Sequence, residues 1–174
     1  MNNMNLKELK EYLKLEPLNK EGGLIGYPYV SDEIIKEGIL EDRDGDRPLC
    51  GTIYYVLTPN SFSRMHKLVS DEIWYYHDGP ALKMLLIDEE GNSEIKYLGN
   101  NLKKGETPQI TVKRNTWQGA LMNEDGEYTL VSTSMAPKYC DSDYTDGYYD
   151  DLKNYVKEEE KELLKRLTGE PVYE

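Results

Sequence analysis

A histidine, a glutamate and a glutamine on three separate β-rich segments are the residues in this sequence best suited to chemistry. His66 lies in FSRMHKLV, Glu72 in EIWYYH and Gln118 in WQGALM. Because side chains alternate across a strand, Glu72 shares one face with Trp74 and Tyr76. An imidazole, a carboxylate and an amide facing one enclosed, aromatic-lined space would supply the few polar groups that a small-molecule pocket needs.

Proton transfer is one reaction that this set supports. A histidine close to a carboxylate can titrate near neutral pH, so His66 with Glu72 or Asp71 forms a candidate acid–base pair. Two simpler interpretations stay open. His66 alone would also fit a hydrogen-bonded core histidine, and Glu72 alone would fit one half of an ion pair with a neighbouring Lys or Arg.

Eight short β-rich runs between Cys50 and Met135 must position these residues. They are TIYYVLT, FSRMHKLV, EIWYYH, ALKMLLID, EIKYL, QITVKR, WQGALM and YTLVSTSM. Turn residues such as Asp78-Gly79-Pro80 and Asp125-Gly126 separate them about every ten residues. This regular spacing predicts an all-β sandwich or barrel.

Helices are predicted at both ends of the chain. Residues 5–15 place Leu6, Leu9 and Leu13 at helical spacing behind Asn5, a suitable N-cap. Residues 150–168 form an amphipathic pattern that Gly169 ends.

The segments between the helices and the barrel are less regular. Within residues 16–48 only GGLIGYPYV is typical of a strand. Two acidic clusters, Asp42, Asp44 and Asp46 and then Asp141 and Asp143, lack the glycine of a calcium loop. We expect solvated loops there.

The length of the chain limits the number of domains, and its net charge limits the classes of molecule that it can bind. A chain of 174 residues predicts one domain, residues 1–174, with a barrel core at about 50–136. The net charge of -12 argues against nucleic acid and against anionic membrane surfaces. No apolar run is long enough for a signal peptide or a membrane span, so a cytoplasmic location is expected.

An ordered series of short motifs resembles one family. His66, four residues, Asp71-Glu72, six residues and Gly79 look like the first cupin motif. The motifs EGG, IYY, SxxH, SDEIW, LG, PQ, WQGA and AP then follow one another between Glu21 and Pro137. The sequence thus resembles the small single-domain cupins of unknown function, over roughly residues 13–152.

The resemblance implies a fold and a site. The fold would be a double-stranded β-helix, the cupin jelly-roll barrel, with a short N-terminal helix and a C-terminal amphipathic helix. Members are usually homodimers with the site inside the barrel. After EGG the family usually has an arginine and an acidic residue, and this sequence lacks both. Residues 31–47 form an acidic insertion that is longer than in the usual member.

Metal binding in cupins usually takes three histidines and one glutamate. This chain keeps His66 and Glu72 but has Leu68 and Gln118 at the other two positions. A divalent metal ion on His66, Glu72 and Gln118 would need water or substrate to complete its shell. A metal site therefore stays an open alternative to a site without a cofactor.

The related epimerases imply a histidine base and a tyrosine acid. With 15 tyrosines in the chain, Tyr54, Tyr76 and Tyr128 are candidate acids, although each also fits simple packing. Ser63, Gln109 and Gln118 are candidate polar ligand contacts. Trp74 is a candidate stacking surface, with packing in the barrel wall as the alternative.

These observations lead to three functional hypotheses. The first is a small-molecule-binding cupin, with a sugar or sugar-nucleotide isomerase or epimerase as the favoured activity. The second is a metal-dependent oxygenase or lyase. The third is a non-catalytic, storage-like or structural barrel.

Overall fold

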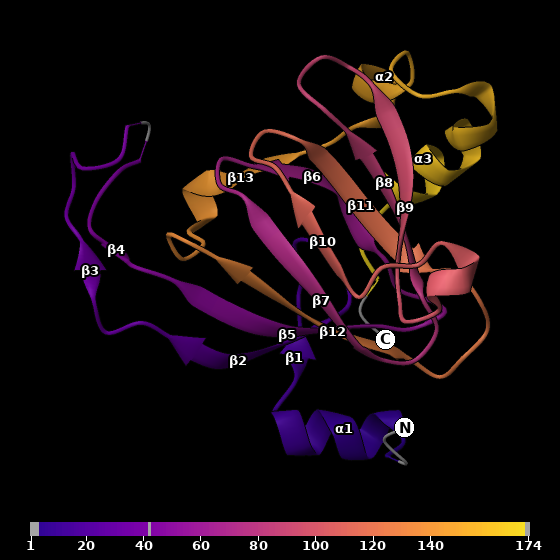
Figure 1. The fold of residues 1–174 in the computed structure, drawn as a ribbon, viewed down its shortest axis with the longest axis horizontal. Coiled ribbons are helices and arrows are strands. Elements are labelled where there is room, and N and C mark those ends of the chain that lie inside the picture. The colour runs from indigo at the N-terminus through magenta and orange to yellow at the C-terminus, as the bar shows by residue number, and fades with distance from the viewer. Residues whose placement is uncertain (1–3, 42, 173–174) are drawn as a thin grey trace.

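Two antiparallel sheets face each other and enclose the main core of the computed structural model, which describes residues 4–41 and 43–172 (Figure 1). The first sheet has the order β1-β2-β5-β12-β7-β10 and the second the order β13-β6-β11-β8-β9. The predicted all-β barrel of two sheets is confirmed.

The strands of the first sheet are β1 (Glu16–Pro17), β2 (Leu24–Val30), β5 (Gly51–Leu57), β12 (Thr129–Met135), β7 (Glu72–Asp78) and β10 (Gln109–Val112). Those of the second are β13 (Tyr144–Asp146), β6 (Ser63–Leu68), β11 (Trp117–Met122), β8 (Leu82–Ile87) and β9 (Ser93–Leu98). All eight predicted runs are strands, β5 to β12. Strands β1, β2 and β13 extend the sheets beyond the expected core of residues 50–136.

Alternation along the strands divides the apolar residues between layers. Leu82, Met84 and Leu86 of β8 point between the sheets, whereas Leu85 and Ile87 point outward. Both faces of β8 are therefore buried, which explains why its apolar residues follow one another without alternating with polar ones.

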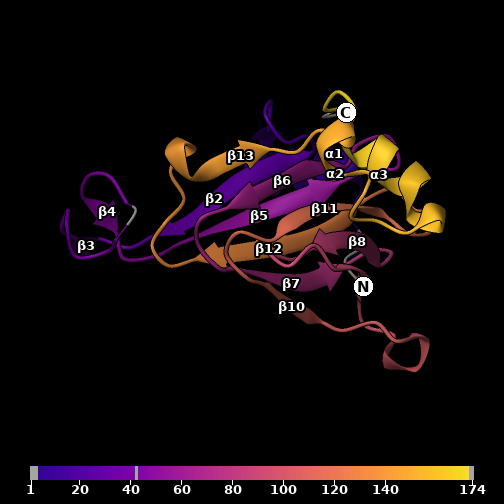
Figure 2. The ribbon, with the colours of Figure 1, turned by 90° about the horizontal axis from the view of Figure 1, so that it is seen from above.

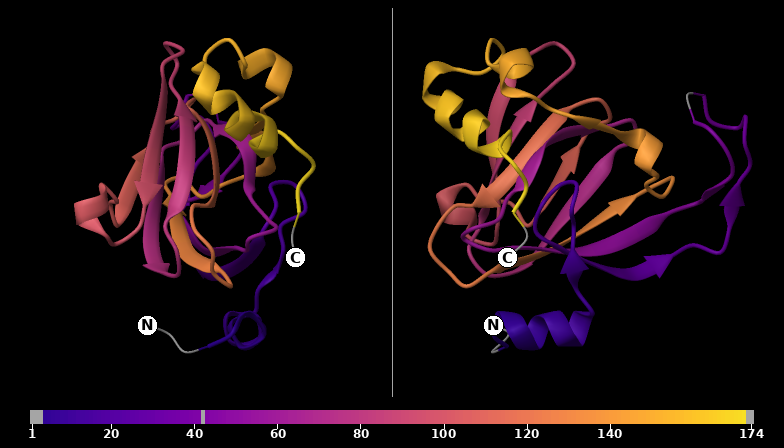
Figure 3. Two further views of the ribbon diagram at one scale, coloured as in Figure 1. Left: turned by 90° about the vertical axis from the view of Figure 1, so that its right-hand side faces the viewer. Right: turned by 180° about the vertical axis from the view of Figure 1, so that it is seen from behind.

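Helices cover the outer faces of the sheets. Helix α1 (Leu6–Leu13) packs Leu9 against Leu24 and Val56 of the first sheet. Asn5 caps it, accepting a hydrogen bond from the Glu8 amide at 3.0 Å, as predicted. Helices α2 (Tyr149–Leu152) and α3 (Lys161–Leu167) lie against the second sheet, away from α1 (Figure 3).

The sequence predicted one continuous helix over residues 150–168, but the structure divides this segment into shorter helices. A turn follows α2, and the 3-10 helix η3 (Glu158–Glu160) precedes α3. The buried carboxylate of Glu160 explains the break, because it accepts hydrogen bonds from the Lys157 amide at 3.0 Å and from Ser93 Oγ at 2.6 Å. These bonds begin a new helical turn at Lys157.

An arm made of β3 (Ile34–Ile35) and β4 (Arg47–Pro48) extends away from the barrel (Figure 2). Two further 3-10 helices, η1 (Leu102–Lys104) and η2 (Asp141–Asp143), lie in the connections. Within the described residues, no helix is long and apolar enough to cross a membrane.

Candidate functional site

A buried hydrogen-bond network joins four of the predicted site residues. Glu72 Oε2 accepts one hydrogen bond from Trp74 Nε1 at 3.1 Å and another from Gln118 Nε2 at 2.7 Å. Gln118 Oε1 in turn accepts a second bond from Trp74 Nε1 at 3.0 Å. His66, Trp74 and Gln118 are each 1% exposed, and Glu72 is 6% exposed. The four side chains therefore form one buried unit inside the barrel, contributed by β6, β7 and β11.

The orientation of His66 follows from its two partners. Its Nδ1 lies 2.7 Å from the carbonyl oxygen of Arg64, which can only accept, so Nδ1 carries the proton. Its Nε2 lies 3.4 Å from Gln118 Nε2, a donor. Its Nε2 is thus placed to accept a hydrogen bond from the Gln118 amide. Its ring stacks on Tyr144 with centroids 4.8 Å apart.

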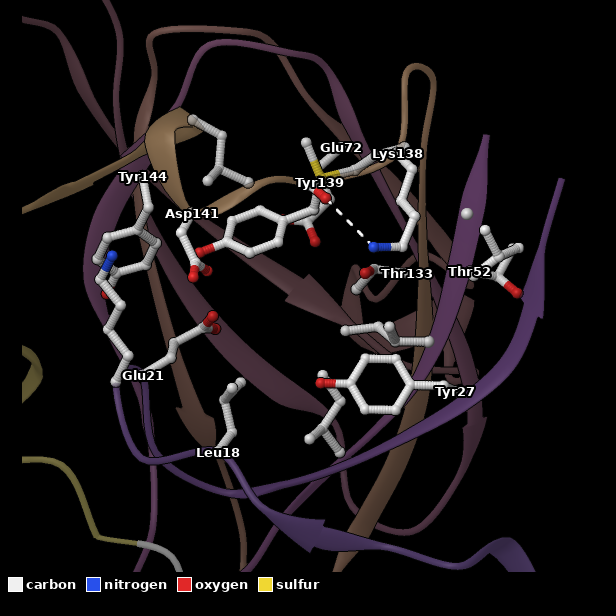
Figure 4. A pocket seen from close by; sticks show the side chains of 17 residues that line it. Leu18, Glu21, Tyr27, Thr52, Glu72, Thr133, Lys138, Tyr139, Asp141 and Tyr144 are labelled. Atoms are coloured by element: carbon white, nitrogen blue, oxygen red, sulfur yellow. Dashed lines mark hydrogen bonds between the residues drawn. The ribbon is translucent and has the colours of Figure 1, made fainter. Parts of the chain in front are cut away.

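The barrel contains a cavity of about 180 Å³ next to this network (Figure 4). Of the predicted site residues, only Glu72 lines it. Most of its wall is apolar or aromatic: Leu18, Ile25, Tyr27, Val30, Ile53, Leu68, Met135, Tyr139 and Tyr144. Its polar groups come from Lys20, Glu21, Thr52, Glu72, Thr133, Lys138 and Asp141. The cavity and the network meet at the Glu72 carboxyl group.

Glu72 is the buried titratable group at this junction. Burial raises the pKa of Glu72 above its usual range, and the negative charge of Glu21 raises it further. The charge of His66 and then the hydrogen bond from Gln118 act in the opposite direction, because both stabilise the carboxylate. The carboxyl group therefore holds its proton to a higher pH than an exposed glutamate does.

Glu21 is a second carboxyl group of the cavity that the site prediction missed. It accepts a hydrogen bond from Ser63 Oγ. Burial raises the pKa of Tyr55, Tyr139 and Tyr144, and the charge of Glu21 raises each of them further. Figure 4 shows its side chain directed into the cavity. Ser63, a predicted ligand contact, is fully buried and supports Glu21 instead of lining the cavity.

The EGG motif was the sequence signal that could have identified Glu21. Gly22 and Gly23 have φ angles of 102° and 69°, which glycine adopts at little cost. A Cβ on Gly22 would also clash with the carbonyl oxygen of Phe62. The motif therefore encodes the tight turn that aims Glu21 inward.

The segment from Lys138 to Tyr144 forms another cavity wall that the sequence left unassigned. Burial raises the pKa of Tyr139, and the charge of Asp141 raises it further. Figure 4 shows the Tyr139 hydroxyl and the Asp141 carboxylate on the side of the cavity that Glu21 faces. Residues expected to form an irregular loop thus contribute directly to the pocket.

A buried ion pair holds this wall in place and corrects one expectation. Arg47 Nη1 lies 2.7 and 2.6 Å from the two carboxylate oxygens of Asp143, and the side chains are 5% and 2% exposed. Asp143 therefore does not lie in a solvated loop, because Arg47 of the arm compensates its charge. Asp44, Asp46 and Asp141 are exposed, as predicted. Asp42 lies outside the described residues.

The remaining predicted site residues lie away from the cavity. Tyr76 packs on the core between the sheets and donates its hydroxyl hydrogen to the Gly79 carbonyl at 2.5 Å. Gln109 is exposed on β10. Tyr54 packs with α1 on the outer face of the first sheet, because alternation on β5 points it outward, and Tyr128, just before β12, lies in the same cluster.

The donor set does not fit a metal ion. His66 Nδ1 binds a backbone carbonyl, and the Gln118 amide lies between His66 Nε2 and Glu72. Leu68 stands at a position where a ligand would be needed. Among the described residues, no group of three or more His, Cys, Asp and Glu side chains is arranged to bind a metal. The neutral amide occupies the place that a shared cation would take.

Comparisons with known proteins agree with this architecture. The model of the family described as cupin superfamily (DUF985) matches residues 7–145. A solved structure from Shewanella oneidensis has 28% identity and a TM-score of 0.82, covering 97% of this chain and 99% of that one. A hypothetical protein from Leishmania major has 26% identity and a TM-score of 0.79, covering 98% and 100%.

More distant structures share the fold alone. A cupin 2 conserved barrel domain protein from Rhodopseudomonas palustris has 10% identity and a TM-score of 0.52, covering 84% of this chain and 83% of that one. No curated protein matches the sequence. Because the family model spans most of the chain, the protein belongs to the DUF985 family of the cupin superfamily.

Proposed function

We propose that the protein binds a small molecule inside the barrel, with the Glu72 carboxyl group in direct contact with it. The observation that carries this proposal is the position of Glu72, which joins a cavity of about 180 Å³ to a buried polar network. Apolar walls with a few fixed polar groups are typical of ligand sites. A storage-like or structural barrel would have no need for such a cavity beside a buried acid.

The volume limits the size of the ligand. An engineered apolar cavity of about 150 Å³ holds benzene, so this cavity accommodates a molecule somewhat larger than benzene. A single sugar ring is of that order. A sugar nucleotide would have to leave its nucleotide outside the cavity.

Proton transfer of the isomerase or epimerase kind is the reaction that the site supports best. An acid whose pKa is raised toward neutrality is a suitable proton donor and acceptor. In this proposal Glu72 exchanges the proton with the ligand. His66 reaches the ligand only through Gln118 and Glu72, so it acts as a positioning residue.

A thermal-shift screen with unlabelled metabolites tests the proposal. Ligands that stabilise the native protein should lose that effect in Glu72→Gln, which keeps the shape of the side chain but cannot ionise. Glu11→Gln, on the exposed face of α1, is the matched control and should respond like the native protein. A ligand set that stabilises all three proteins equally would contradict the proposal.

We further propose that two copies associate through the arm, in a protein that works in the cytoplasm. Large apolar side chains are exposed on this part of the chain: Tyr29, Val30, Ile34, Ile39 and Leu49. Beyond Ile25, β2 pairs only with β5, which leaves its other edge open among the described residues. Open edges and clustered apolar side chains favour association.

A further inference from the structure

Glu21 and Glu72 face the cavity without a cationic partner. Among the described residues, neither they nor Asp141 forms an ion pair with Lys, Arg or His. Glu72 accepts hydrogen bonds from neutral groups, the Trp74 indole and the Gln118 amide. Such donors orient a carboxylate without forming an ion pair with it, and His66 is the nearby group whose charge favours the ionised form.

Among the described residues, the two lysines of the cavity form no ion pair with these carboxylates. The ammonium group of Lys138 donates to the carbonyl oxygen of Tyr139 at 3.4 Å. That of Lys20 lies 4.1 Å from the centroid of the Tyr144 ring. Both ammonium groups are held by neutral partners, and once Glu72 is ionised the three carboxylates that line the cavity outnumber them.

The walls of the cavity suit a positive charge that carries apolar substituents. Tyr27 and Tyr139 present aromatic rings, and Figure 4 shows them on different sides of the space. The faces of aromatic rings attract cations, and they do so more strongly where water is excluded. Leu18, Ile53 and the other aliphatic residues of the wall would contact the apolar part of such a molecule.

We infer that the cavity binds a small organic cation, an ammonium group with a short apolar body, and that Glu21 and Glu72 recognise its charge. The inference rests on the proposed function and specifies its ligand class. Phosphates and carboxylates would place further negative charge beside the carboxylates of Glu21, Glu72 and Asp141, which outnumber the two lysines. The net charge of -12 would also attract cations and repel anions at long range.

The indole hydrogen of Trp74 provides a direct reporter, because it is bonded to Glu72. The experiment follows the two tryptophan indole signals in ¹⁵N-labelled protein by NMR, assigning them with Trp117→Phe. The probes are choline and n-butylammonium, their neutral counterparts 3,3-dimethylbutan-1-ol and n-butanol, the anion 3,3-dimethylbutanoate, and glucose. Each is titrated at one constant ionic strength.

Choline or n-butylammonium should shift the Trp74 signal and bind at least about tenfold more tightly than its neutral counterpart, a difference of about 1.4 kcal/mol. Glu21→Gln should remove most of that preference and leave the weak binding of the alcohol unchanged. Glu11→Gln should change neither.

Three results would overturn the inference. One is equal binding of cation and neutral counterpart, another is preferential binding of glucose or of the anion, and the third is no response to either cation. In each case the proposed function is judged separately by the metabolite screen. A neutral metabolite that depends on Glu72 would leave that function standing, and only a screen without any Glu72-dependent ligand contradicts it.

Discussion

Trp74 donates its indole hydrogen to Glu72 over 3.1 Å, and both residues belong to the same face of β7. Residues two apart on a strand point the same way, so the strand itself brings donor and acceptor together. The pair fixes the carboxyl group at the edge of the cavity. Its removal should therefore affect both stability and ligand binding.

Trp74→Phe should destabilise the protein by about 2 kcal/mol, because a buried carboxyl group loses a hydrogen-bond donor. Urea unfolding followed by circular dichroism measures the change. Trp117→Phe is the matched control, since Trp117 lies outside the network and its ring is covered by Lys67 Nζ at 4.7 Å. Equal losses of stability in the two variants would show that packing, and not the hydrogen bond, accounts for the effect.

The raised pKa of Glu72 predicts how stability depends on pH. The unfolded chain ionises this group near the ordinary value of 4.5, whereas burial keeps it protonated in the folded chain to higher pH. Stability is therefore lost as pH rises from about the unfolded value through the folded one. Glu72→Gln should gain stability relative to the native protein between pH 4 and neutral pH.

The comparison of the two melting curves against pH isolates Glu72, because the other groups are common to both proteins. Three titratable groups near it are Glu21, His66 and Tyr144. In a Glu21→Gln background the gain should be smaller, because the charge of Glu21 contributes to the shift. A difference that stays constant with pH would mean that Glu72 titrates normally.

A site residue could be predicted from the sequence where its orientation follows from the pattern of its own strand. The β-runs, their turns and the inward face of Glu72 and Trp74 follow from alternation along each strand. Glu21 and Tyr144 were missed because they reach the cavity from outside the predicted core, by chain paths that no local pattern reveals. Tyr54 and Gln109 were candidates by residue type, and only sheet pairing determines that they point away.

The ion pair between Arg47 and Asp143 should be required for a folded cavity wall. Arg47→Met leaves a buried carboxylate without its partner, which costs about 3–5 kcal/mol. Arg47→Met combined with Asp143→Leu should recover most of this loss, because both charges are then gone. Chemical denaturation of the two single variants and the double variant gives the coupling energy. An additive double variant would contradict the pairing.

Metal removal should leave the protein unchanged. The Gln118 amide holds His66 and Glu72 in place of a cation, so EDTA should not alter the melting temperature. Elemental analysis of the purified protein should find Fe, Mn, Ni and Zn well below one atom per chain. One tightly bound equivalent, whose removal shifts the Trp74 indole signal, would restore the oxygenase or lyase hypothesis.

Association through the arm makes a prediction about the side chains that point into solvent. Ile34 is 47% and Ile39 is 67% exposed, although burying such a side chain gains roughly 1.5–3 kcal/mol. If a second copy covers them, Ile34→Glu and Ile39→Glu should each raise the dissociation constant of the dimer about tenfold or more. Sedimentation velocity over a range of concentrations measures this dissociation constant.

Leu102→Glu is the control, because Leu102 is 68% exposed on η1 and away from the arm. A native protein that sediments as a monomer at every concentration, or a control that dissociates the dimer equally, would place the contact elsewhere or exclude it.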